Sequence, residues 1–69
     1  MLTVKLKEDY IRLGQALKAA GIAGSGVDAK FMIQEGHVKV NGTTEYQRGK
    51  KLYDKDRIEC NGEIIEIIK

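Results

Sequence analysis

The chain has no proline, no tryptophan and only one cysteine among its 69 residues. One cysteine excludes an internal disulfide and a cysteine-ligated zinc site, and an unpaired thiol is typical of a reducing compartment. No apolar run approaches the roughly 18 residues that a membrane-spanning helix needs, and the N-terminal residues alternate in polarity, unlike the core of a signal peptide. We therefore expect a cytoplasmic protein with no membrane partner.

The sequence is also poor in the residues of catalysis. Its single histidine, His37, has no carboxylate or cysteine at a spacing typical of a metal site or a catalytic triad. A chain this short buries only about 60% of its unfolded surface, which leaves no room for both a core and a deep catalytic cleft. We expect one domain over residues 1–69, no enzymatic activity, no metal and no cofactor.

Hydrophobic periodicity predicts a strand followed by two short helices. Polarity alternates over residues 2–6, which is typical of a half-buried strand, and the period changes to that of a helix from Tyr10 until Gly21 ends it. Ser25, followed three residues later by Asp28, has the form of a capping box that starts a second helix. The apolar face predicted for this second helix comprises Val27, Ala29, Phe31, Met32 and Ile33.

The second half of the chain predicts two hairpins. The pairs Asn41-Gly42 and Asn61-Gly62 each follow a period-two segment and suit the positive φ angles of a type I′ turn. The segment 64–68 is apolar on both faces, so we expect it inside the sheet. The predicted fold is α+β, with two short helices packed on a small antiparallel sheet of four to five strands.

Positive charge is concentrated in one segment. Five Lys+Arg and two Asp+Glu lie between Lys30 and Lys51, a local charge of +3 against +2 for the whole chain. Clustered cations favour a polyanionic partner, because each phosphate that they neutralise releases counterions; a solvated surface is the alternative. Arg48, Lys50 and Lys51 form a basic loop without acids, and the Gly24-Ser25-Gly26 corner offers helix amides to a phosphate or simply permits a sharp turn.

The order of these elements resembles the RNA-binding domain named after ribosomal small-subunit protein four, the S-four domain. The matching residues are Arg12-Leu13, Leu17, Gly21, Ser25, Ala29, Ile33, Gly36, Val38 and Val40-Asn41-Gly42. The chain also resembles the small stand-alone bacterial proteins of the YaaA and YbcJ type in Gly24-Ser25-Gly26, Ala29-Lys30 and Arg48-Gly-Lys-Lys-Leu52. The resemblance implies the S-four-like (alpha-L) fold and binding of structured RNA, often ribosomal. Gly26 stands where many members have an arginine.

We therefore expect a monomer that binds structured RNA, such as ribosomal RNA or a ribosomal subunit, without catalysis. The four aromatic residues form no stripe that would stack single-stranded bases, which favours recognition of shape and backbone, and most of these rings are expected in the core. The candidate RNA-binding residues are Lys18, Ser25, Lys30, Gln34, His37, Lys39, Arg48, Lys50 and Lys51.

Two other functions fit the sequence. The chain could be a protein-interaction module that uses its isoleucine-rich C-terminal strand for edge pairing. It could also be a small ubiquitin-like carrier, but such carriers usually end in Gly-Gly, whereas this chain ends in Ile67-Ile68-Lys69.

Overall fold

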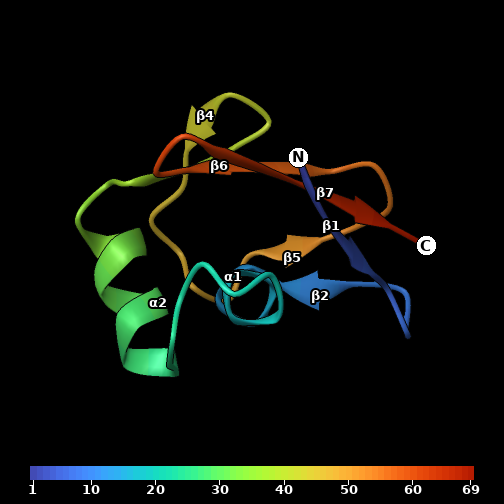
Figure 1. Ribbon diagram of the computed structural model, residues 1–69, viewed down its shortest axis with the longest axis horizontal. Coiled ribbons are helices and arrows are strands. Elements are labelled where there is room, and N and C mark those ends of the chain that lie inside the picture. Colours follow the sequence, from blue (N-terminus) through green and yellow to red (C-terminus); the bar gives the residue numbers. More distant parts are fainter.

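The C-terminal strand β7 (Glu63–Ile68) lies inside the main sheet, with both of its edges paired (Figure 1). In the computed structural model, which describes all 69 residues, β7 runs parallel to β1 (Leu2–Lys5) and antiparallel to β6 (Arg57–Cys60). Strands β3 (Val38–Val40) and β4 (Thr43–Thr44) complete the order β1-β7-β6-β3-β4. The prediction that the isoleucine-rich segment lies inside the sheet is confirmed.

Both predicted hairpins are present, and their turns have the expected backbone. Asn41 and Gly42 have φ angles of 51° and 85°, and Asn61 and Gly62 have φ angles of 52° and 79°. The first turn joins β3 to β4, and the second joins β6 to β7. Asparagine and glycine tolerate this left-handed region, so each pair fixes the register of its hairpin locally.

The two predicted helices form, and both lie on the same side of the five-stranded sheet (Figure 1). Helix α1 (Leu13–Ala19) ends before Gly21, which has a φ of 78°, and α2 (Gly26–Gln34) starts where Ser25 Oγ accepts a hydrogen bond from the Asp28 amide at 3.1 Å. The predicted stop and N-cap are confirmed. Neither helix has the length and apolar character needed to cross a membrane.

A short two-stranded ribbon was not expected from the sequence. β2 (Ile11–Arg12) precedes α1 and pairs antiparallel with β5 (Lys51–Leu52), with Ile11 opposite Leu52 and Arg12 opposite Lys51. The predicted helix start at Tyr10 is therefore three residues too early. The predicted α+β fold is confirmed, with this ribbon as an addition. The expectation of an antiparallel sheet needs one correction, because β1 pairs parallel with β7.

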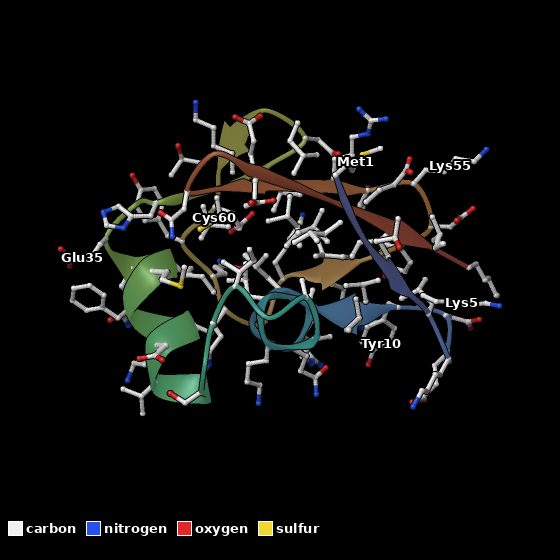
Figure 2. All side chains as sticks on the ribbon, viewed as in Figure 1. Met1, Lys5, Tyr10, Glu35, Lys55 and Cys60 are labelled. Atoms are coloured by element: carbon white, nitrogen blue, oxygen red, sulfur yellow. The ribbon has the colours of Figure 1, made fainter.

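One hydrophobic core joins the helices to both sheets, and no polar or charged side chain is buried. Its largest fully buried members are Leu13, Leu17, Ile33, Val38, Leu52, Ile58, Ile65 and Ile67. Cys60 is also buried, as Figure 2 shows on the inner side of the sheet. Leu52 of β5 is part of this core, so hydrophobic packing holds the β2–β5 ribbon against the helices. The hydrogen bonds of the ladder join the two strands of the ribbon to each other.

The predicted apolar face of α2 was too broad. Ala29 and Ile33 are fully buried, whereas Val27 and Phe31 are 77% and 61% exposed. Residues two positions apart on a helix are rotated by about 200°, so Val27 and Phe31 lie on the side opposite Ala29. Ala29 and Ile33 face the core, Met32 is half-buried and packs against it, and Val27 and Phe31 face solvent.

The expectation that most aromatic rings pack in the core was also wrong. Tyr10, Tyr46 and Tyr53 are 37%, 63% and 50% exposed, and Phe31 is exposed on α2. Tyr10 and Tyr53 flank the inward-facing Ile11 and Leu52 and have the opposite strand parity, which directs them outward. The core of this small domain is filled by aliphatic side chains instead.

Candidate functional site

The basic loop over residues 47–50 is pinned to the start of α1. The first amides of a helix have no partner within the helix. Here the Leu13 and Gly14 amides donate to the carbonyls of Lys50 and Arg48, at 2.9 and 3.0 Å. The Lys50 amide closes the loop on the Gln47 carbonyl at 3.2 Å. These three hydrogen bonds hold the loop in place beside the helix.

Arg12 adds a side-chain contact to this arrangement. Its Nη1 donates to the Gly49 carbonyl at 2.8 Å, across 37 positions of the chain. The Gln15 side chain in turn accepts from the Arg12 amide at 3.4 Å. The start of α1 and the basic loop thus form one unit that carries the guanidinium groups of both Arg12 and Arg48.

A shallow groove of about 300 Å³ lies between this unit and the start of α2. It is called the basic groove below, and its lining residues are Arg12, Gly14, Gln15, Lys18, Gly26, Ala29, Arg48 and Gly49. Three of these residues are cationic and none is acidic. Lys18 follows Gly14 by four positions and Gln15 by three, so one side of α1 supplies all three of these residues.

The cations of the basic groove are not neutralised within the molecule. The chain has two ion pairs, Arg57 with Glu66 at 3.7 Å and Lys69 with Asp9 at 3.1 Å, and neither involves a groove residue. The nearest cationic neighbour on α2 is Lys30, which follows Gly26 by one helical turn and is exposed. The groove and Lys30 therefore form a positive surface that is free to meet an external anion.

The Gly24-Ser25-Gly26 corner borders the groove through Gly26. Neither glycine has a positive φ, and a Cβ on Gly26 would meet nothing within 4 Å, so the turn itself does not require glycine at position 26. Ser25 Oγ is occupied as an acceptor by the Asp28 amide but keeps its own hydrogen as a donor. The Asp28 carboxylate lies in the first turn of α2 and would repel a phosphate that approaches this corner.

The other candidate residues are distributed over separate parts of the surface. Gln34 and His37 lie at the far end of α2 from the groove. Lys39 lies between the buried Val38 and Val40 and so projects from the opposite face of the sheet, where Glu59 is its neighbour on β6. The structure does not bring Lys39 together with Lys30 and Arg48.

The three cations of the predicted basic loop diverge, and one of them, Lys51, lies in β5. Arg48 lines the basic groove, whereas Lys50 and Lys51 border a second hollow that also contains Glu45 and Asp56. The Nζ of Lys51 lies 4.8 Å from the centre of the Tyr10 ring. The loop thus presents its charges in two directions, one toward α2 and one toward the outer face of the β2–β5 ribbon.

Arg12 was not among the candidate residues chosen from the sequence. A two-residue strand is too short for its period to be recognised, so Arg12 stood out only as part of the family pattern. Its position became interpretable once β2 was paired with β5. The one signal in the sequence was the shared pattern of Tyr10-Ile11-Arg12 and Lys51-Leu52-Tyr53, in which a buried aliphatic residue lies between an aromatic and a cationic residue.

No group of three metal-ligating side chains occurs in the structure. Burial raises the pKa of the Cys60 thiol, which keeps this side chain protonated and neutral at physiological pH. Cys60 lies under the sheet among aliphatic neighbours, away from the basic groove. It acts as a small hydrophobic residue, as its strand parity with Ile58 predicts.

The family model of the S4 domain matches residues 4–68 of the chain. The chain belongs to the S4 domain family. The S4 domain accounts for nearly the whole sequence, and the resemblance noted from the motif residues is confirmed.

Two bacterial proteins with S4-like sequences illustrate the relationship. The chain is 39% identical over 59 residues to the probable ribosome maturation protein RlbA of Bacillus subtilis, with 86% of this chain and 83% of RlbA covered. It is 31% identical over 62 residues to the putative RNA-binding protein YbcJ of Escherichia coli, with 90% and 89% covered.

The fold of this S4 domain is also that of a solved relative. The solution structure of Escherichia coli YbcJ, described as having an alfaL motif involved in RNA binding, matches with a TM-score of 0.77 at 31% identity. The match covers 100% of this chain and 89% of YbcJ. Helices, hairpins and the interior C-terminal strand therefore belong to a shared architecture.

Proposed function

We propose that this S4 domain is a non-catalytic, cytoplasmic protein that binds structured RNA as a monomer, with the basic groove as the centre of its interface. The observation that carries the proposal is the groove itself, in which Arg12, Lys18 and Arg48 converge without a carboxylate. Phosphates of a folded RNA are the polyanion that fits such a surface. The names of YbcJ and RlbA support RNA as the partner.

The groove suits backbone recognition rather than the reading of bases. It is shallow, and three of its eight lining residues are glycines, so phosphates can approach the main chain closely. Arg48 and Arg12 can each hold two oxygens of one phosphate, which lysine cannot do. Lys30 extends the same surface along α2, with Gln34 and His37 beyond it and the Ser25 hydroxyl beside it.

Ribosomal RNA or a ribosomal particle is the proposed target, supported by the ribosome maturation name of RlbA. The alternative of strand addition through the C-terminal segment has no free edge to use, because β7 is paired on both sides. Crosslinking in cells, followed by sequencing of the attached RNA and by sedimentation with ribosomal subunits, tests the target. Recovery of ribosomal RNA no more often than with an unrelated small protein contradicts it.

Two matched double variants test the groove. Lys18→Gln with Arg48→Gln removes two charges inside it, and Lys39→Gln with Lys55→Gln removes two charges outside it. The groove variant is expected to bind an RNA stem-loop at least tenfold more weakly at low salt, and the slope of its plot of log affinity against log salt should be smaller in magnitude by about 1.4 to 1.8. The outer variant should change both quantities much less. Equal losses in the two variants contradict the basic groove as the interface.

A further inference from the structure

The outer face of the β2–β5 ribbon carries four side chains in a two-by-two array. Arg12 lies opposite Lys51 in the ladder, and the same antiparallel register places Tyr10 opposite Tyr53 two residues further along. Between them, the inward positions are filled by Ile11 and Leu52, of which Leu52 is fully buried. The remaining four side chains therefore project to the same outer side. They are called the tyrosine–cation array below.

The contacts within the array divide its members into two roles. The Lys51 Nζ and the Arg12 Cζ lie 4.8 and 5.7 Å from the centre of the Tyr10 ring, so Tyr10 holds both cations by cation–π attraction. The Tyr53 ring has no cation over it, is 50% exposed, and lies 6.2 Å from the Tyr10 ring at a tilt of 53°. Tyr10 thus positions positive charge, and Tyr53 presents an open aromatic surface.

The array is continuous with the basic groove through Arg12, which lines the groove and also contacts the Tyr10 ring. Figure 2 shows Tyr10 beside β2, on the side away from the five-stranded sheet. A chain of nucleotides that leaves the groove past Arg12 next meets Lys51 and then the exposed ring of Tyr53. An aromatic surface beside cations is the combination that binds an unpaired nucleotide, since the ring stacks on the base while the cations meet its phosphate.

Resting on the proposed function, we infer that the tyrosine–cation array binds an unpaired nucleotide next to the structured RNA in the basic groove. Tyr53 stacks on the base, and Lys51 and Arg12 contact the adjoining phosphate. Two hydrogen bonds hold the backbone of Tyr53 in place. The Tyr53 amide donates to Asp56 Oδ2 at 2.7 Å, and the Tyr53 carbonyl accepts from the Asp56 amide at 3.1 Å. The preferred RNA is therefore a stem with a single-stranded extension rather than a blunt stem.

The RNA side of the test uses three stem-loops: a blunt one, one with an oligoadenosine extension, and one with an abasic extension that keeps the phosphates. The wild-type protein is expected to bind the adenosine extension roughly 5- to 50-fold more tightly than the abasic one. The affinity for the abasic extension should exceed the affinity for the blunt stem only slightly, and this difference should shrink as the salt concentration rises. Equal affinity for the adenosine and abasic extensions overturns the inference but leaves the groove proposal intact. Binding to none of the three RNAs overturns both.

The protein side uses variants that keep or remove the ring. Tyr53→Leu should lose the preference for adenosine over abasic RNA, and Tyr53→Phe should keep it. Tyr46→Leu, which removes a tyrosine that is 63% exposed outside the array, should behave like the wild type. Loss of the preference in Tyr46→Leu, or its retention in Tyr53→Leu, contradicts the role of Tyr53.

Fluorescence supplies a measurement that does not depend on how Tyr53→Leu folds. The chain has three tyrosines and no tryptophan, so its emission comes from tyrosine alone. Stacking of a base on Tyr53 should quench part of this emission when the adenosine extension binds the wild type. Tyr53→Phe should bind equally well with less quenching, and identical fractional quenching in the two proteins contradicts direct stacking.

Discussion

A Cβ atom on Gly14 would lie 2.7 Å from Cγ of Arg48 and 3.3 Å from its Cδ. The Arg48 side chain therefore crosses α1 at the one position where the helix has no side chain. The Gly14 amide also donates to the Arg48 carbonyl at 3.0 Å, so both the backbone and the side chain of Arg48 are placed by Gly14. The direction of a central cation of the basic groove depends on this contact.

Gly14→Ala is expected to weaken RNA binding more than it weakens the fold. Alanine favours a helix over glycine by about 1 kcal/mol, which offsets part of the cost of moving the Arg48 side chain from its Cγ outward. The displaced guanidinium should reduce affinity for an RNA stem-loop by roughly fivefold or more. Thermal unfolding and fluorescence anisotropy measure the two effects. In an Arg48→Gln background, Gly14→Ala should cause no further loss of affinity, and an undiminished loss there contradicts the mechanism.

Gly26→Arg is expected to strengthen RNA binding. The space around Gly26 is open, since a Cβ there meets nothing within 4 Å, and Gly26 lines the basic groove. An added guanidinium can therefore reach a phosphate without displacing a neighbour. Salt titrations should show tighter binding at low salt and a slope steeper by about 0.7 to 0.9. Gly26→Gln, of similar reach but uncharged, is the control, and equal effects of the two substitutions would argue against a phosphate contact.

Asn41 and Asn61 occupy equivalent turns, and glycine substitutions should separate their roles. The two φ angles are 51° and 52°, but only the Asn41 side chain is bonded across the fold. Its Nδ2 donates to Asp56 Oδ1 at 3.0 Å, and its Oδ1 accepts from the Arg57 amide at 2.9 Å.

Asn41→Gly should therefore lower the free energy of unfolding by about 1 to 2 kcal/mol more than Asn61→Gly, because glycine keeps the turn but loses these two bonds. Urea denaturation of both variants measures the difference. Equal destabilisation would mean that the bonds to Asp56 and Arg57 contribute nothing to stability.

Cys60 should make the fold less stable in alkaline solution. Burial raises the pKa of its thiol above the ordinary value of 9.0. The unfolded chain therefore loses this proton at a lower pH than the folded chain, and the free energy of unfolding falls as the pH rises through and above 9.0. Below that range the contribution is fully present.

The matched variant Cys60→Ala isolates this effect from the titration of lysines and tyrosines. The variant lacks the packing of the thiol at every pH, but its free energy of unfolding should fall less steeply than that of the wild type as the pH rises through the alkaline range. Urea denaturation under reducing conditions, on both sides of the ordinary thiol pKa, gives the comparison. Parallel declines for the two proteins would exclude Cys60 as the source.

The sequence by itself determined the features that depend on neighbouring residues. The Asn-Gly turns, the Ser25 cap and the stop at Gly21 each rest on the conformational preferences of a few adjacent residues, and all are present. The interior position of residues 64–68 was equally predictable, because a segment that is apolar on both faces is unsuited to a bare edge of a sheet. The helices cover only one face of this strand, and Ile64 on its other face stays 39% exposed. For α2, the same reasoning assigned too many apolar residues to the core, since contiguous hydrophobicity does not say which side of a helix is covered.

Only the tertiary structure decided how the cations and tyrosines are grouped. Arg12 meets Gly49 across 37 positions, and the pairing of β2 with β5 turns two unremarkable tripeptides into an array of tyrosines and cations. Such pairings are set by the packing of Leu52 and Leu13 in a shared core and by helix amides that find their acceptors in a distant loop. These are long-range contacts whose free energy is gained only when the whole chain has folded, so local patterns do not contain them.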